Sequence, residues 1–153
     1  MRTRGFELIT EENKKECGEG LYQPKLPTRA TKKAMAYDFY SPSRFVLLPD
    51  EKALIWTGVK AYMQDNEGLV INIRSSMGGM LELVNTQGWI DADYYNNNKN
   101  EGNIGIFLKN VSPHPIVINR HDRIAQGMFI TTLVADNGNT EKERTGGFGS
   151  SGK

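Results

Sequence analysis

Short runs of apolar side chains alternate along this chain with clusters of turn-forming residues, and this pattern predicts β-strands. We expect strands within residues 5–9, 34–40, 44–49, 53–61, 69–74, 81–84, 104–108, 115–119 and 124–134. No stretch shows the sustained period of a long helix. Strand-length runs separated by turn signals are typical of a sandwich or barrel, so we expect an all-β fold.

The stretch 85–95 stands out because it ends a short β-type run with a carboxylate, Asp91, and follows it with an aromatic ring, Tyr94. Residues 96–103 are rich in Asn and Gly, and residues 104–108 form a new β-type run. Two strands around such a loop predict a β-hairpin. A hairpin with an acid and a ring is either a pocket for a flat polar ring or an exposed hairpin with a solvated acid.

The composition narrows the class of protein. At 153 residues the chain suits one domain, and its net charge of +1 gives no basic field for a nucleic-acid partner. Cys17 is the only cysteine, and His114 and His121 fall in separate loops, so no disulfide framework or zinc spacing is present. Without a signal-like or membrane-spanning apolar run, we expect a soluble, cytoplasmic protein with no membrane partner.

The composition shifts near the C-terminal end. We expect a β domain over residues 1–135 and a flexible, Gly-rich arm over residues 136–153. The spacing in 147–153 imitates a phosphate loop, but the following Ser or Thr and the helix that this motif needs do not follow. The arm is either a disordered tail or a segment that orders over a ligand, with Arg144 on phosphate and Phe148 stacked on a base.

Two other stretches carry candidate chemistry. Arg74 with two hydroxyl neighbours, Ser75 and Ser76, is either a phosphate grip or an arginine on the rim of a sheet. Residues 122–126 open the last strand and, taken alone, are best interpreted as a solvated strand-entry turn.

In chain order, these pieces resemble the five motifs of the trimeric deoxyuridine triphosphate nucleotidohydrolases (dUTPases). The matching segments are residues 34–40, 74–76, 85–94, 122–126 and 144–152. Any one of these motifs is weak evidence, whereas five in the right order are specific. The segment between Arg74 and Asn85 is shorter than the family pattern, and Ala36 and Ser76 stand where Gly is common.

The resemblance implies a jelly-roll-like β fold in a homotrimer with an exchanged C-terminal arm. Each active site would combine motifs one, two and four of one subunit, the hairpin of a second and the arm of the third. The implied reaction is the Mg²⁺-dependent hydrolysis of dUTP to dUMP and pyrophosphate, which keeps uracil out of DNA.

The family pattern also implies roles for individual residues. Asp91 would be the general base, and Tyr94 would pack under the deoxyribose and exclude a 2′-hydroxyl. The expected uracil-binding residues are Asn85, Gly88, Ile90 and Gly105. The expected triphosphate-binding residues are Arg74, Ser75, Ser76 and Gln126, with Arg144, Gly149, Ser150 and Ser151 closing on the far end and Phe148 covering the base.

Mg²⁺ would be bound mainly by phosphate oxygens and waters, with no direct protein ligand. Asp38 would not bind the metal directly, but would position either Arg74 or the waters bound to the metal.

Two rival functions share this pattern. A dCTP deaminase has the same fold, but the glutamate that its chemistry needs would fall at Phe107, and residues 104–108 contain no carboxylate. The other rival is a dUTPase-like binding protein that acts on a regulatory partner, as in a phage-derived system. The retained Asp91 and Arg144 favour the enzyme over the binding protein.

Overall fold

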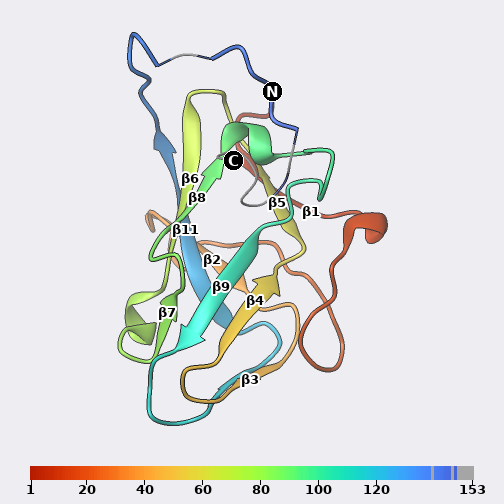
Figure 1. Cartoon of the computed structure of the whole chain (residues 1–153), viewed down its shortest axis with the longest axis vertical. Coiled ribbons are helices and arrows are strands. Elements are labelled where there is room, and N and C mark those ends of the chain that lie inside the picture. Colours follow the sequence, from red (N-terminus) through yellow and green to blue (C-terminus); the bar gives the residue numbers. More distant parts are fainter. Residues whose placement is uncertain (139, 146, 148–153) are drawn as a thin grey trace.

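The computed structural model describes residues 1–138, 140–145 and 147, and within them the chain is built from strands and short 3-10 turns (Figure 1). The turns are η1 (Glu11–Asn13), η2 (Ser75–Met77) and η3 (Ala92–Tyr94). The predicted all-β, jelly-roll-like fold is therefore confirmed. In the part of the chain that the structure describes, no helix is long and apolar enough to cross a membrane.

Antiparallel ladders join the strands into four groups. The largest sheet has the order β2 (Tyr37–Tyr40), β11 (Arg123–Thr131), β6 (Glu67–Asn72) and β8 (Gly88–Asp91). A second sheet has the order β4 (Lys52–Trp56), β9 (Gly105–Asn110) and β7 (Leu81–Leu83). Two pairs complete the fold: β1 (Gly5–Leu8) with β5 (Val59–Tyr62), and β3 (Phe45–Leu47) with β10 (Ile116–Ile118).

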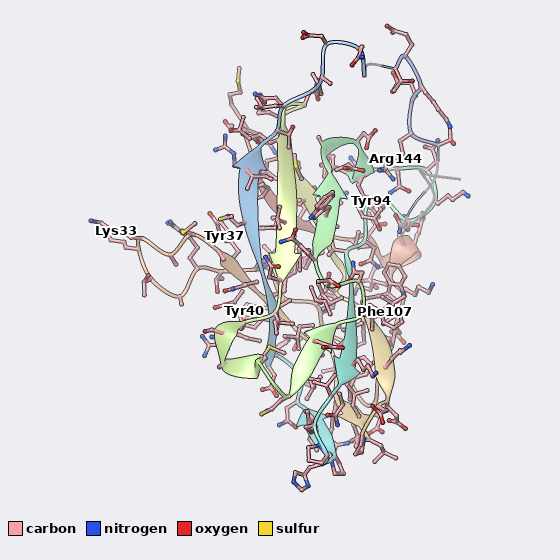
Figure 2. All side chains as sticks on the ribbon, turned by 60° about the vertical axis from the view of Figure 1, so that its left-hand side comes forward. Lys33, Tyr37, Tyr40, Tyr94, Phe107 and Arg144 are labelled. Carbon is pink, nitrogen blue, oxygen red and sulfur yellow. The ribbon has the colours of Figure 1, made fainter. Side chains whose placement is uncertain are left out.

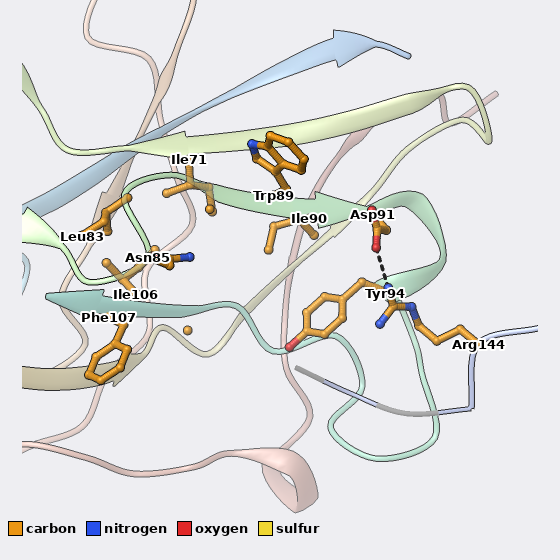
Figure 3. A pocket seen from close by; sticks show the side chains of 12 residues that line it. Ile71, Leu83, Asn85, Trp89, Ile90, Asp91, Tyr94, Ile106, Phe107 and Arg144 are labelled. Atoms are coloured by element: carbon orange, nitrogen blue, oxygen red, sulfur yellow. Dashed lines mark hydrogen bonds and ion pairs between the residues drawn. The ribbon is translucent and has the colours of Figure 1, made fainter. Parts of the chain in front are cut away.

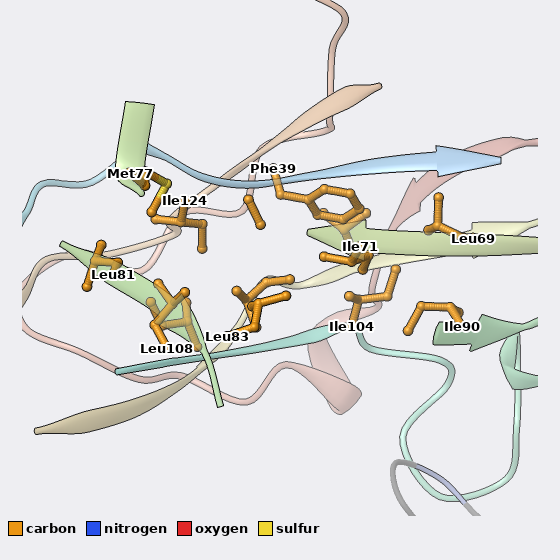
Figure 4. Close-up of a cluster of buried hydrophobic side chains, with 14 of the residues drawn as sticks. Phe39, Leu69, Ile71, Met77, Leu81, Leu83, Ile90, Ile104, Leu108 and Ile124 are labelled. Carbon is orange, nitrogen blue, oxygen red and sulfur yellow. The ribbon is translucent and has the colours of Figure 1, made fainter. Parts of the chain in front are cut away.

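The core lies between the two larger sheets (Figure 4). Alternate side chains of each strand point inward, as the two-residue period of a strand requires. In β9 these are Ile106 and Leu108, which meet Phe39, Leu69 and Ile71 of the four-stranded sheet. All five are almost fully buried, so the apolar runs of the sequence correspond to one continuous core.

One predicted strand is divided in the structure. Residues 53–61 were expected to be continuous, but β4 and β5 are separated at Thr57 and Gly58 and pair with different partners. Gly58 has a φ of +71°, which a side chain rarely adopts, and a Cβ there would lie 2.4 Å from the ring of Pro24. The break turns the chain from the three-stranded sheet to the ladder with β1.

The predicted hairpin is also corrected. Among the described strands, β8 and β9 flank the Asn- and Gly-rich loop as expected, but they do not pair with each other. β8 pairs with β6, in the four-stranded sheet, and β9 pairs with β4 and β7. The two strands therefore belong to separate sheets (Figure 1).

Candidate active site

A pocket of about 330 Å³ occupies the opening between β8 and β9 (Figure 3). Its walls come from β6, β7, β8, β9, the turn η3, the connection before β8 and the C-terminal arm. The lining residues are Ile71, Leu83, Asn85, Gly88, Trp89, Ile90, Asp91, Tyr94, Gly105, Ile106, Phe107 and Arg144. Seven of the expected site residues are thus brought together in one chain: Asn85, Gly88, Ile90, Asp91, Tyr94, Gly105 and Arg144.

The two glycines leave room in this pocket. A Cβ on Gly88 would lie 3.3 Å from the Cβ of Ile71. At Gly105 it would lie 3.0 Å from Leu54 and 3.2 Å from the Trp56 ring, so a larger residue would press on these side chains of β4, which lie outside the pocket lining. The width of the pocket therefore depends on backbone, and a flat ring of modest size suits it.

Tyr94 is buried, and two hydrogen bonds hold its hydroxyl. The residue is only 4% exposed, and its hydroxyl donates to the Asn103 carbonyl at 2.5 Å. The same hydroxyl accepts from Asn100 Nδ2 at 2.8 Å. Burial raises the pKa of Tyr94, so the hydroxyl stays protonated and keeps both bonds.

Asp91 stands at the mouth of the pocket with an exposed side chain. Arg144 donates from Nη2 to Asp91 Oδ2 at 2.6 Å and from Nε to Asp93 Oδ1 at 2.7 Å. Its guanidinium carbon lies 5.6 Å from the centroid of the Tyr94 ring. The described part of the arm thus reaches the loop of its own chain, where Gly147 approaches the side chain of Asn100.

A second polar cluster surrounds the buried carboxylate of Asp38. Arg74 Nε donates to Asp38 Oδ1 at 3.1 Å, and Arg123 Nη1 lies 3.6 Å from Oδ2. Arg74 also donates to Ser76 Oγ at 3.3 Å, and Gln126 is the register partner of Asp38 across β2 and β11. Ser75 follows Arg74 in the exposed turn η2. The short segment between Arg74 and Asn85 thus contains the 3-10 turn η2 and strand β7.

The two clusters lie far apart within one chain. Asp38 is on β2 and Asp91 is on β8, the opposite edges of the four-stranded sheet, about 14 Å apart across three strand spacings. Asp91 is the register partner of Gly68 on β6. Arg74 lies six residues after Gly68, which corresponds to about 20 Å along the strand direction. Figure 2 shows the same separation, with Tyr37 and Tyr40 of β2 well away from Tyr94 and Arg144.

Not every expected site residue lies in the described part of the chain, and the pocket also contains residues that were not expected. Phe148, Gly149, Ser150 and Ser151 lie outside the described residues. The sequence interpretation did not foresee that Asp93 would share Arg144 with Asp91, nor the lining role of five residues: Ile71, Leu83, Trp89, Ile106 and Phe107. The alternating period of β9 could have indicated which of its residues face inward, whereas nothing local marks Leu83, which lies on another strand.

Comparisons with known proteins agree with this geometry. The family model described as dUTPase matches residues 23–152. The chain is 42% identical to a deoxyuridine 5′-triphosphate nucleotidohydrolase of Lactococcus lactis, over 99% of each chain. Against the crystal structure of a dUTPase from Streptococcus mutans the TM-score is 0.72 at 39% identity, covering 86% of this chain and 98% of that one.

A more distant structure shares the fold. It is a mutant dUTPase from phage phi11 of S. aureus, 23% identical, with a TM-score of 0.68 over 92% of this chain and 98% of that one. That structure is described as revealing the coordination of a structural Mg(II) ion.

Proposed function

The chain belongs to the dUTPase family, and from this premise we propose that it hydrolyses dUTP to dUMP and pyrophosphate, with Asp91 as the base. The observation that carries the proposal is an exposed carboxylate at the mouth of a narrow pocket whose wall is the buried ring of Tyr94. By removing dUTP, this reaction keeps uracil out of DNA.

The pocket supports recognition of uracil. Gly88 and Gly105 leave space for a flat ring, and Asn85 supplies an amide that can both donate to and accept from the edge of a base. A 5-methyl group on the base would need extra width, which the packing behind Gly105 does not offer. Ile90 is buried beside this space and closes it from the core side.

Tyr94 contacts the sugar, and Asp91 activates the water that attacks the α-phosphate. The Tyr94 ring lies against the deoxyribose and leaves no room for a 2′-hydroxyl. Asp91 orients a water for in-line attack and accepts its proton, while the bond from the α-phosphorus to the bridging oxygen breaks and pyrophosphate leaves. The exposed carboxylate of Asp91 supports this role, because water reaches it directly.

The second cluster supports binding of the triphosphate. Arg74 has a planar, permanently charged head, which Asp38 orients at Nε and Ser76 at Nη1. Ser75, Ser76 and Gln126 add neutral donors beside it. Both Asp38 oxygens face arginines, which favours a role in positioning Arg74 over a role on the waters of a metal.

We infer that the site is shared in a homotrimer. The β- and γ-phosphates extend far less beyond Asp91 than the separation between Asp91 and Arg74 of one chain. Arg74 of a second chain therefore has to face the pocket of the first, and the arm, with Arg144 and residues 148–151, closes the site. In the family arrangement this arm comes from the third chain.

Mg²⁺ fits this site as a companion of the substrate. Within the described residues no three His, Cys, Asp or Glu side chains form a metal cluster, and Mg²⁺ prefers phosphate oxygens and water. The ion would be held by the triphosphate and would neutralise part of its charge. The residues of the chain would contact it only through waters.

The test is product analysis with dUTP, dCTP, dTTP and UTP, with and without Mg²⁺. We expect dUMP and pyrophosphate from dUTP alone, and a large loss of this turnover in the Asp91→Asn variant. Ammonia from dCTP would instead make the protein a deaminase, a reaction that the apolar Phe107 on β9 argues against. No turnover of any nucleotide would leave a nucleotide-binding protein with a regulatory partner.

Sharing of the site is tested by mixing two inactive variants, Asp91→Asn and Arg74→Ala, under conditions that exchange subunits. If the site is shared, some mixed trimers join an intact Asp91 of one chain to an intact Arg74 of another, and activity returns. If each chain holds its own complete site, the mixture stays inactive.

A further inference from the structure

Glu101, in the loop between β8 and β9, has a carboxylate that is hydrogen-bonded by three residues from two segments, the turn η1 and strand β5. Lys60 Nζ lies 2.7 Å from Oε1. Oε2 accepts from Thr10 N at 3.1 Å, Thr10 Oγ1 at 2.7 Å and Asn13 Nδ2 at 2.9 Å. Burial opposes the charged form, but these donors outweigh it and lower the pKa of Glu101 to about 2. Glu101 is thus a fixed negative charge inside the loop.

Lys60 ties the loop to the body of the protein. Its side chain is 8% exposed, and its Nζ donates to Asn96 Oδ1 at 2.6 Å as well as to Glu101. The backbone N–H of Asn96 donates to the backbone carbonyl of Glu101 at 2.9 Å. Asn96 and Glu101 have φ values of +56° and +63°, and Gly102 has +94°. Such backbone is held only where the surroundings determine it, and here Lys60 contacts both ends of the turn.

The residues on either side of Glu101 hold the hydroxyl of Tyr94. Asn100 donates to that hydroxyl, and the carbonyl of Asn103 accepts from it. Asn103 is 1% exposed, and its side chain accepts from Gly58 N at 3.0 Å. A shift of Glu101 would therefore move both partners of the Tyr94 hydroxyl.

We propose that the Lys60–Glu101 ion pair is a positioning device for the Tyr94 ring and thereby sets the preference for a 2′-deoxy sugar. This proposal rests on the proposed function, in which Tyr94 lies against the deoxyribose. Neither Lys60 nor Glu101 lines the pocket, so both act through Tyr94 and not on the substrate. A buried ion pair adds little net stability over apolar packing, and fixing one arrangement of the chain is its best-attested use.

The test compares kcat/KM for dUTP and UTP in four proteins: the unmodified chain, Glu101→Gln, Tyr94→Phe and the double variant. Glu101→Gln keeps the size of the side chain and removes its charge. We expect the preference for dUTP over UTP to fall about tenfold in Glu101→Gln, mainly because UTP turnover rises. In the Tyr94→Phe background, where the hydroxyl is gone, the same change should cause no further fall.

Two further variants keep the test decisive. If Glu101→Gln does not fold, Thr10→Val takes its place. It removes one donor to Glu101 and leaves the ion pair, so the preference for dUTP should fall in the same direction but by less. Glu19→Gln breaks the exposed ion pair with Arg44 and should leave the preference unchanged.

The outcomes separate this proposal from the proposed function. An unchanged preference in folded Glu101→Gln, or equal falls with and without the Tyr94 hydroxyl, would overturn the positioning role. Absence of dUTP turnover in the unmodified chain would instead contradict the proposed function itself, and this inference with it.

Discussion

The pocket beside Tyr94 and the polar cluster around Asp38 lie at opposite edges of one sheet and are held in different ways. The pocket is surrounded by two sheets and by a loop whose Asn100 and Asn103 side chains are tied into the fold. The cluster around Asp38 has one buried carboxylate, while Ser75 and Ser76 are exposed. A base of fixed shape suits a rigid pocket, whereas a flexible triphosphate suits an exposed, charged surface.

The two edges also differ in what a single chain can achieve. The pocket edge is nearly complete in one chain, including the carboxylate of Asp91. The cluster around Asp38 contributes none of the residues that line this pocket, and in the proposed trimer it serves the pocket of another chain. We therefore expect changes at the pocket edge to alter chemistry and selectivity, and changes at the Asp38 edge to alter affinity for the phosphates.

The largest effect is expected at Asp91, where the pocket meets the phosphates. Asp91→Asn should reduce kcat about 10²- to 10⁴-fold, because the general base is lost while the pocket remains. Binding of dUMP, measured by calorimetry, should change little. Asp93→Asn is the matched control, since Asp93 also binds Arg144 but has no role as a base. An equal loss in both variants would mean that holding Arg144, and not proton transfer, is what matters.

Next in size is an acid-dependent loss of stability at the pocket edge. The pKa of Glu101 is lowered in the folded state, so its stabilisation is complete above the unfolded value and is lost as the pH falls from about 4.5 towards 2. Glu101→Gln should lower the free energy of unfolding by about 1.5 to 3 kcal/mol near neutral pH. The difference from the unmodified chain should shrink below pH ~4.5 in urea titrations. A difference that stays constant down to pH ~2.5 would contradict the ion pair.

A smaller effect is expected at the Asp38 edge. Arg74→Lys keeps the charge but loses the planar fork that Asp38 and Ser76 orient. We expect kcat/KM for dUTP to fall about tenfold, with the affinity for dUMP unchanged because dUMP lacks the outer phosphates. Arg44→Lys at the exposed pair with Glu19 should show no change. A loss of dUMP affinity equal to the loss for dUTP would place Arg74 at the base or sugar instead.

The contrast between the two edges also explains how far the sequence could be interpreted. Strand periodicity predicted the elements, and motif order predicted Asp91, Tyr94 and Arg74 as site residues, because these depend on local spacing. Strand pairing does not depend on local spacing. β8 pairs with β6 and β9 pairs with β4 and β7, so the expected hairpin was wrong. The role of Glu101 could not be predicted from the sequence either, because its partners Lys60 and Thr10 are distant in sequence and contact it only in the fold.

The smallest effect is expected from adding one methyl group, by a Gly→Ala change, at each of the two edges. Gly105→Ala would bring a Cβ to within 3.0 Å of Leu54 and 3.2 Å of Trp56, so these side chains must move by a few tenths of an ångström. We expect KM for dUTP to rise about threefold with kcat unchanged, because the contact with β4 shifts the β9 wall of the pocket without moving Asp91. Gly78→Ala is the matched change near the Asp38 edge, where the nearest atom is 3.5 Å away and φ is −56°. Its KM should equal that of the unmodified chain. If both variants raised KM equally, the two edges would be packed alike, and the division between a rigid pocket and an open phosphate surface would fail.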